Sequence, residues 1–256
     1  MITLLSPAKS MNFDFPKPAI PTTIPVFADD ADYLAKKLKK MSSTKIGELM
    51  HISTALADLN YERYQNWEKP AAPSDLNFPC AMAFSGEVYK GLDLQSLNKT
   101  ELKIAQQKIR ILSGLYGVLK PLDVIYPYRL EMGTKWEITS KIKNLYAYWK
   151  EKSTPLLNQE LKDLKTDVIV NLASTEYFKS IDLKKIDATI ITPVFKDFKN
   201  GKLKIIMMYA KHARGAMARY IVQKNLKDVQ QLKLYDVDGY HYSENDSTET
   251  EWVFVR

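Results

Sequence analysis

The segments Thr189-Ile-Ile-Thr-Pro-Val-Phe-Lys-Asp-Phe198 and Lys202-Leu-Lys-Ile-Ile-Met-Met-Tyr209 flank the dipeptide Asn200-Gly201. Asparagine followed by glycine favours a two-residue type I′ turn, because both central residues of that turn need positive φ. The stretch therefore predicts a β-hairpin with arms over 189–198 and 202–209. The residues that follow, 210–225, have the periodicity of a helix.

Around this hairpin, helical and extended patterns mix without the regular alternation of a doubly wound sheet. Helical periodicity covers residues 27–64, 100–112 and 144–164. Short apolar runs predict strands at residues 2–5, 80–85, 167–172 and 251–255. We therefore expect a mixed α/β (α+β) fold, in which one compact domain over residues 1–256 surrounds a mixed sheet with helices.

The composition favours a basic protein with polyanionic partners. The chain has 37 Lys and Arg against 30 Asp and Glu, a net charge of +7 and a pI near 9.1. Such an excess favours binding to polyanions if it is clustered on the surface. The single cysteine, Cys80, cannot form an internal disulfide, and the apolar start Met1–Leu5 is too short for a signal peptide. We expect a cytoplasmic protein without a membrane span, and we favour a monomer.

Common catalytic and cofactor motifs are absent from the sequence. It contains no GxxxxGK[ST], GxGxxG, CxxC, HExxH or GxSxG. The three histidines, His51, His212 and His241, lie far apart and are not spaced as metal ligands. We therefore assign no cofactor and no metal site.

The predicted helix after the hairpin carries cations beside small residues. Lys211 and Arg214 share a face with Gly215, Ala218 and Val222, which would leave room for an anion. Three further cations belong to this unit: Lys202, Lys204 and Arg219. Phosphate contact and a plain solvated basic face both fit this pattern.

Two other segments combine charges with helix or strand ends. In Pro121–Gly133, Arg129 and Glu131 fall on one side of an extended segment, which fits a structural ion pair or a substrate clamp. In Asn171–Lys179, a strand leads into a helix with Ser174 or Thr175 as N-cap and Glu176 in its first turn. Lys9 would join Asn171 and Lys179 only if the fold brings them together.

Residues 49–64 contain a degenerate helix-hairpin-helix pattern. Leu56-Ala-Asp-Leu-Asn60 would form the hairpin, with Asp58 and Asn60 at the usual glycine positions. Only Asn60 and Arg63 could then contact DNA phosphates, because the carboxylate of Asp58 would repel them. An ordinary packing corner between two helices fits the same residues.

Five motifs lie in order over nearly the whole chain: Ser6-Pro-Ala-Lys9, Leu112-Ser-Gly-Leu-Tyr-Gly-Val-Leu-Lys-Pro-Leu-Asp123, Pro127-Tyr-Arg-Leu-Glu-Met-Gly133, Asn171-Leu-Ala-Ser-Thr-Glu-Tyr-Phe-Lys179 and Tyr209-Ala-Lys-His-Ala-Arg-Gly215. With these motifs the chain resembles the YaaA family of bacterial peroxide-stress proteins. The resemblance implies a family-specific α/β fold with a positively charged cleft and a helix-hairpin-helix element. It also implies DNA binding and a role in limiting iron-driven oxidative damage. By matching positions, the cleft would contain Lys9, Arg110, Arg129, Lys179, Lys211 and Arg214.

Three functions follow from these patterns. The leading hypothesis is a DNA-binding protein that recognises backbone and shape in duplex or branched DNA, without reading sequence. The second is an enzyme acting on a nucleic acid or nucleotide through Lys9, Arg129, Glu131, Asn171, Glu176 and Lys211. The third, direct iron sequestration, has the least support, because the chain has one cysteine and scattered histidines.

Overall fold

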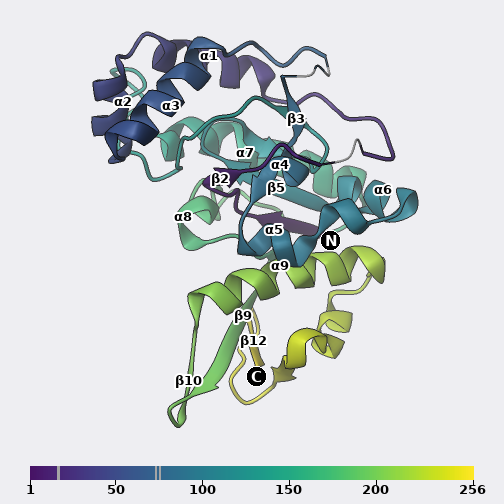
Figure 1. Cartoon of the computed structure of the whole chain (residues 1–256). Helices are drawn as coiled ribbons and strands as arrows, with labels where there is room; N and C mark the ends of the chain where they lie inside the picture. Colours follow the sequence, from purple (N-terminus) through teal and green to yellow (C-terminus); the bar gives the residue numbers. More distant parts are fainter. Residues whose placement is uncertain (16–17, 73, 75) are drawn as a thin grey trace.

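A mixed β-sheet runs through the molecule and takes strands from both ends of the chain (Figure 1). The computed structural model describes residues 1–15, 18–72, 74 and 76–256. Across the sheet the strands are β11 (His241–Ser243), β12 (Glu251–Val255), β9 (Thr189–Lys199), β8 (Val168–Asn171), β1 (Ile2–Leu5), β5 (Ile109–Ser113) and β6 (Gly117–Leu119), and β10 (Lys202–Lys204) pairs with β9. The predicted mixed α/β fold is thus confirmed.

The centre of the sheet is parallel and its borders are antiparallel. β1 lies between β5 and β8, and β8, β9 and β12 continue in the same direction. β6, β10 and β11 each pair antiparallel with a neighbour. All four residues of β1 are buried, as expected for a central parallel strand with both faces covered. The carboxyl ends of β1, β5 and β8 consequently meet at one edge of the sheet.

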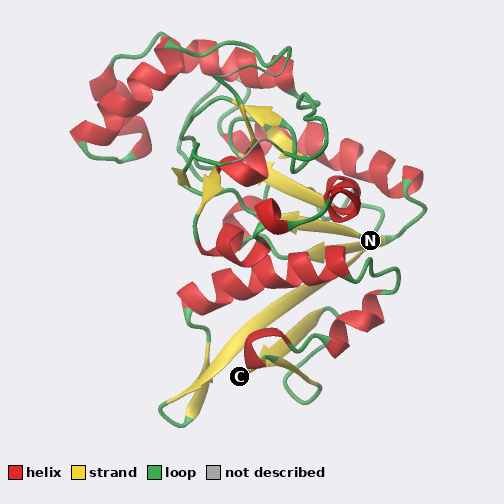
Figure 2. Cartoon of the chain, turned by 45° about the vertical axis from the view of Figure 1, so that its right-hand side comes forward, coloured by secondary structure: helices red, strands yellow, loops and turns green. Residues whose placement is uncertain are grey.

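Helices pack around this sheet (Figure 2). The longer ones are α1 (Ala28–Lys39), α2 (Ser43–Met50), α3 (Thr54–Gln65), α6 (Lys99–Lys108), α7 (Leu145–Asp163) and α9 (Met207–Gln223). The short ones are α4 (Cys80–Ala83), α5 (Glu87–Leu92) and α8 (Thr175–Phe178), with 3₁₀ helices at Leu94–Ser96, Val229–Leu234 and Val237–Gly239. Two small ribbons complete the fold: β2 (Ser10–Met11) with β4 (Phe84–Ser85), and β3 (Phe78–Pro79) with β7 (Val124–Ile125). Helix α9 packs on α5 and α6 and reaches β1 and β9.

The predicted hairpin is present, but its second arm is shorter than predicted. Asn200 and Gly201 have φ of 55° and 73°, as a type I′ turn requires, and Lys199 pairs with Lys202 beside them. The pairing stops at Lys204, and α9 begins at Met207. The apolar run before Ala210 predicts a strand, because it contains no turn residue. Its last members instead form the first turn of a helix that buries Ala210, Ala213 and Met217.

Other element boundaries were predicted wrongly. The segment 80–85 is buried as expected, but it forms α4 followed by the two-residue strand β4. The predicted helix 100–112 ends at Lys108, because the next five residues pair with β1 as strand β5. The helical stretch 27–64 is divided into three helices.

The predicted hairpin at Leu56–Asn60 is not present, because these residues lie inside the continuous helix α3. Helices α2 and α3 are instead joined at residues 51–53, where His51 adopts the left-handed conformation with φ 50°. The side chain of Asp58 accepts a hydrogen bond from the Ser43 hydroxyl and so joins α3 to α2.

The strands predicted at 2–5, 167–172 and 251–255 are confirmed, as is the helix over 144–164, which continues through Pro155. Within the part of the chain that the structure describes, no helix is long and apolar enough to cross a membrane.

Candidate functional site

Three charged side chains meet near the carboxyl edge of the sheet, and we call them the charge cluster: Lys9, Arg129 and Glu131. Lys9 lies on the segment that leaves β1, and its Nζ is 2.6 Å from Glu131 Oε2. Arg129 Nη2 donates to the other oxygen, Glu131 Oε1, at 2.8 Å. The carboxylate is thus bound from both sides, and it leaves one net positive charge on the cluster. The Lys9 side chain remains 61% exposed and can reach a ligand.

Hydrogen bonds fix the loops that carry this cluster. The Ser174 N–H donates to Ser6 Oγ at 2.8 Å, which ties the loop after β8 to the loop after β1. Tyr89 Oη donates to the Ser6 carbonyl at 2.9 Å. Tyr64 Oη donates to the Arg129 carbonyl at 2.7 Å, so α3 positions the backbone of the segment that carries Arg129 and Glu131. These contacts hold the two cations in place on ordered backbone.

Glu176 lies beside the charge cluster, but it binds the protein backbone. Its Oε1 accepts the Gly133 N–H at 2.9 Å. Burial raises the pKa of the Tyr177 phenol well above its usual value, and the nearby tyrosine Tyr128 and the carboxylates Glu176 and Glu131 raise it further. The sequence-predicted residues Glu131 and Glu176 therefore both lie near Tyr177.

Asn171, at the end of β8, has a structural role in the loop. It is buried, its Oδ1 accepts the Ala173 N–H at 3.2 Å, and its Nδ2 lies 3.4 Å from Thr192 Oγ1. Ser174 is the N-cap residue of α8, as predicted, although its side chain makes no capping hydrogen bond.

Arg63 lies close to Arg129, a neighbourhood that sequence spacing did not reveal. Burial lowers the pKa of the Arg63 guanidinium, the neighbouring Tyr64 raises it, and the charge of Arg129 lowers it further. Its one polar contact among the described residues is Asn60 Oδ1 at 3.4 Å from Nη1. Asn60 is itself 1% exposed and donates to the Leu56 carbonyl, so it cannot contact DNA as predicted. Arg63 keeps its guanidinium available.

The β9–β10 hairpin and the start of α9 present exposed lysines. Lys202, Lys204 and Lys211 are exposed and form no ion pair with any residue that the structure describes, and the same holds for Lys179 after α8. Figure 1 shows the hairpin projecting from the body of the molecule beyond α9. Its lysines are therefore accessible to a large partner.

On α9, the predicted space for an anion beside Gly215 is filled by α5. A Cβ on Gly215 would lie 1.8 Å from the Val88 carbonyl oxygen, so the glycine permits close helix packing. Arg219 is engaged as well, because its Nη1 donates to the carbonyls of Leu92 and Asp93 at 3.2 and 2.8 Å. Arg214 differs: burial lowers the pKa of its guanidinium, and it pairs with no carboxylate among the described residues.

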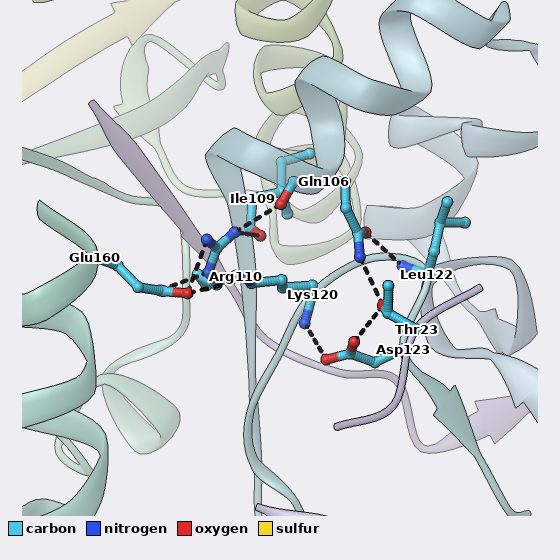
Figure 3. A network of polar contacts seen from close by, with 8 residues as sticks. All are labelled: Thr23, Gln106, Ile109, Arg110, Lys120, Leu122, Asp123 and Glu160. Atoms are coloured by element: carbon cyan, nitrogen blue, oxygen red, sulfur yellow. Dashed lines mark hydrogen bonds and ion pairs between the residues drawn. The ribbon is translucent and has the colours of Figure 1, made fainter. Parts of the chain in front are cut away.

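Arg110, assigned to the cleft by resemblance, is instead part of a buried polar network (Figure 3). Its Nε and Nη2 donate to the two oxygens of Glu160 at 2.7 and 3.0 Å, and Nη1 donates to the carbonyls of Gln106 and Ile109. The side chain is 3% exposed. It joins α7 to the sheet and is unavailable to DNA.

Asp123, in the same network, is expected to titrate near pH 6. Burial raises the pKa of its carboxyl to about 6, although the Thr23 hydroxyl and the Lys120 N–H favour the charged form. The unfolded value is about 4, so the native state retains this proton where the unfolded chain loses it. The contribution to stability is fully present below about pH 4 and is lost as the pH rises through about 6.

Carbon-13 NMR of the Asp123 carboxyl, assigned with Asp123→Asn, measures its pKa directly. A midpoint near 4 would contradict it.

Among the described residues, no group of three or more His, Cys, Asp or Glu side chains is placed to hold a metal ion.

Comparison with known proteins gives one family. The sequence profile of a family described as "Peroxide stress protein YaaA" matches residues 1–246. A "UPF0246 protein" of Alcanivorax borkumensis is 49% identical over 256 residues, which is 100% of this chain and 98% of that protein. Another "UPF0246 protein", from Saccharophagus degradans, is 45% identical over 256 residues, 100% of this chain and 99% of that protein.

Proposed function

We propose that this chain, which belongs to the YaaA family of peroxide stress proteins, binds DNA during the peroxide stress response. Its contacts would be to the phosphate backbone, without reading of base sequence. Binding would help limit iron-driven oxidative damage to DNA. We propose that it acts in the cytoplasm as a monomer.

The observation that carries this proposal is that two arginines on different helices, Arg63 on α3 and Arg214 on α9, are half-buried without a carboxylate partner among the described residues. Arg63 and Arg214 are both removed from water far enough to lower the pKa of their guanidinium groups. Partly desolvated cations are normally paired, because the loss of hydration is costly. Neither has an acidic partner among the described residues, which supports an external anion as the missing partner. Guanidinium groups bind phosphate in bidentate geometry.

Exposed lysines add to the proposed contacts. The proposed DNA-binding residues are Lys9, Arg63, Arg129, Lys179, Lys202, Lys204, Lys211 and Arg214. Asn60, Arg110 and Arg219 are left out, because their polar groups are engaged within the protein. Lysine side chains that neutralise phosphates release counterions, so binding should weaken steeply as salt rises.

The triple variant Lys202→Ala/Lys204→Ala/Lys211→Ala should bind duplex DNA about tenfold or more weakly at physiological salt, and its salt slope should fall by about 3. Fluorescence anisotropy with a labelled duplex measures both quantities.

A matched control removes the same charge elsewhere. Lys99 and Lys103 lie on α6 and Lys224 follows the far end of α9; all three are exposed and unpaired among the described residues. Their triple alanine variant should bind within about twofold of wild type. Equal losses in both variants would show that net charge alone, and not the hairpin surface, determines affinity.

A second candidate function is an enzyme acting on a nucleic acid or nucleotide at the charge cluster. The observation that favours it is the carboxylate of Glu131 held between two cations at 2.6 and 2.8 Å, next to Glu176. Opposite charges gathered in this way are common in catalytic sites. Conversion of a labelled oligonucleotide or nucleotide that is lost in Glu131→Gln would favour the enzyme over a binding protein.

A further inference from the structure

An apolar pocket opens beside α3, and we call it the aromatic pocket. It has a volume of about 340 Å³, and Phe13, Phe78 and Tyr126 contribute aromatic rings to its walls. The pocket also has a polar edge. It is formed by Glu62 and Arg63 of α3 and by Asn66, the C-cap residue of that helix. Glu62 and Asn66 make no side-chain hydrogen bond to another described residue. Apolar walls with a few converging polar groups are typical of a site for a small planar ligand.

Two short segments connect this pocket to the charge cluster. One runs from Lys9 to Phe13, and the other runs from Pro127, which lines the pocket, to Arg129. Two residues of extended chain span about 7 Å, so the cluster lies within one or two nucleotide units of the pocket. Arg63 lines the pocket, and the charge of Arg129 lowers the pKa of its guanidinium, so the two cations lie near one another.

The cations at this junction have unused hydrogen-bonding capacity. Arg129 Nε is buried and has no hydrogen-bond partner among the described residues. Arg63 has no acidic partner there and contacts only the Asn60 amide oxygen. Arg63 therefore places a positive charge that suits a phosphate in the pocket lining, next to the carboxylate of Glu62, and the aromatic rings suit an uncharged ring.

We propose that the aromatic pocket holds one unpaired base of DNA while Arg63 and Arg129 bind the phosphates that flank it. This rests on the proposed DNA-binding function and specifies the form of DNA that the site takes. A base stacked inside a duplex cannot enter a side pocket, so the base must be extruded or already unpaired. Stacking against protein rings is indifferent to base identity, because every base has a π face. Glu62 and Asn66, which also line the pocket, would supply polar contacts to such a base.

The test compares a fully paired duplex with the same duplex carrying one bulged thymine. Wild type should bind the bulged duplex about tenfold more tightly, since stacking of one base is worth about 5- to 150-fold in affinity. Phe13→Ala should reduce this preference below about threefold and leave affinity for the paired duplex within about threefold of wild type.

Phe15→Ala is the matched control. Both phenylalanines pack on Phe78, with ring centroids 4.5 Å away for Phe13 and 6.0 Å for Phe15, but Phe15 does not line the aromatic pocket. Phe15→Ala should keep the preference for the bulged duplex. If both variants lose it equally, a second readout decides: 5-iodouracil at the bulged position should photocrosslink to Phe13, Phe78 or Tyr126.

The outcomes separate the two proposals. Equal affinity of wild type for both duplexes, or a crosslink that maps outside the pocket, overturns the base-binding site and leaves DNA binding intact. If wild type binds neither the paired nor the bulged duplex, the proposed function is overturned, and the base-binding site with it.

Discussion

Replacing Arg110 by methionine is expected to lower the free energy of unfolding by about 3–5 kcal/mol. The guanidinium makes two hydrogen bonds to Glu160 and two to backbone carbonyls, and the pair is almost completely removed from water. Without Arg110, the one cation that the Glu160 carboxylate keeps among the described residues is Lys120, whose Nζ lies 3.5 Å away. Urea denaturation followed by circular dichroism measures the loss.

The double variant Arg110→Met/Glu160→Met is the control for this effect. Removing both charges should recover most of the lost stability, because a buried ion pair contributes little relative to apolar residues of similar size. Lys120→Met alone should cost under about 1 kcal/mol, since this lysine is partly exposed. A loss of less than about 1 kcal/mol in the Arg110 single variant would contradict the description of the network as buried and coupled.

Gly215→Ala is expected to destabilise the protein by about 3 kcal/mol or more. The added methyl would meet the backbone of α5, 1.8 Å from the Val88 oxygen and 2.8 Å from the Leu92 nitrogen. Backbone cannot yield as a flexible side chain does, so α5 and α9 must separate, and overpacking of this kind costs about 1–3 kcal/mol or more. Thermal and chemical denaturation report the change.

Gly47→Ala provides the comparison, because it is also a glycine within a helix. Its added methyl would meet the Ala57 side chain at 3.2 Å, a contact that a small shift relieves. Alanine is the better helix former, so the net change should stay within about 1 kcal/mol. If Gly215→Ala and Gly47→Ala lowered the free energy of unfolding equally, this result would contradict the close packing of α5 against α9.

The fold could be predicted from the sequence where local chemistry specifies the backbone. The Asn200-Gly201 turn was predictable because few other residue pairs tolerate positive φ twice in succession. β5 was missed because no turn residue separates it from α6, and its strand conformation depends on pairing with β1, more than 100 residues earlier in the sequence. Met207–Tyr209 was read as strand for a similar reason, since an apolar run alone does not distinguish strand from helix.

The site could be predicted only for contacts between sequence neighbours. Arg129 and Glu131 are two residues apart, and their pairing follows from the alternation of an extended segment. The third member, Lys9, is brought to Glu131 by the tertiary fold, and so is Arg63 to Arg129. The burial of polar residues could not be predicted from the sequence either. Arg110 and Asn60 have polar side chains, yet both are buried and form their hydrogen bonds within the protein.

The most direct measurement of the central claim is the wild-type arm of the anisotropy titration, with one duplex studied from about 50 to 200 mM salt. DNA binding through the proposed cations predicts that the logarithm of the association constant falls linearly with the logarithm of the salt concentration. With six to eight phosphates contacted, affinity should fall about a thousandfold or more over this range. Absence of binding at the lowest salt, or an affinity independent of salt, would contradict the account.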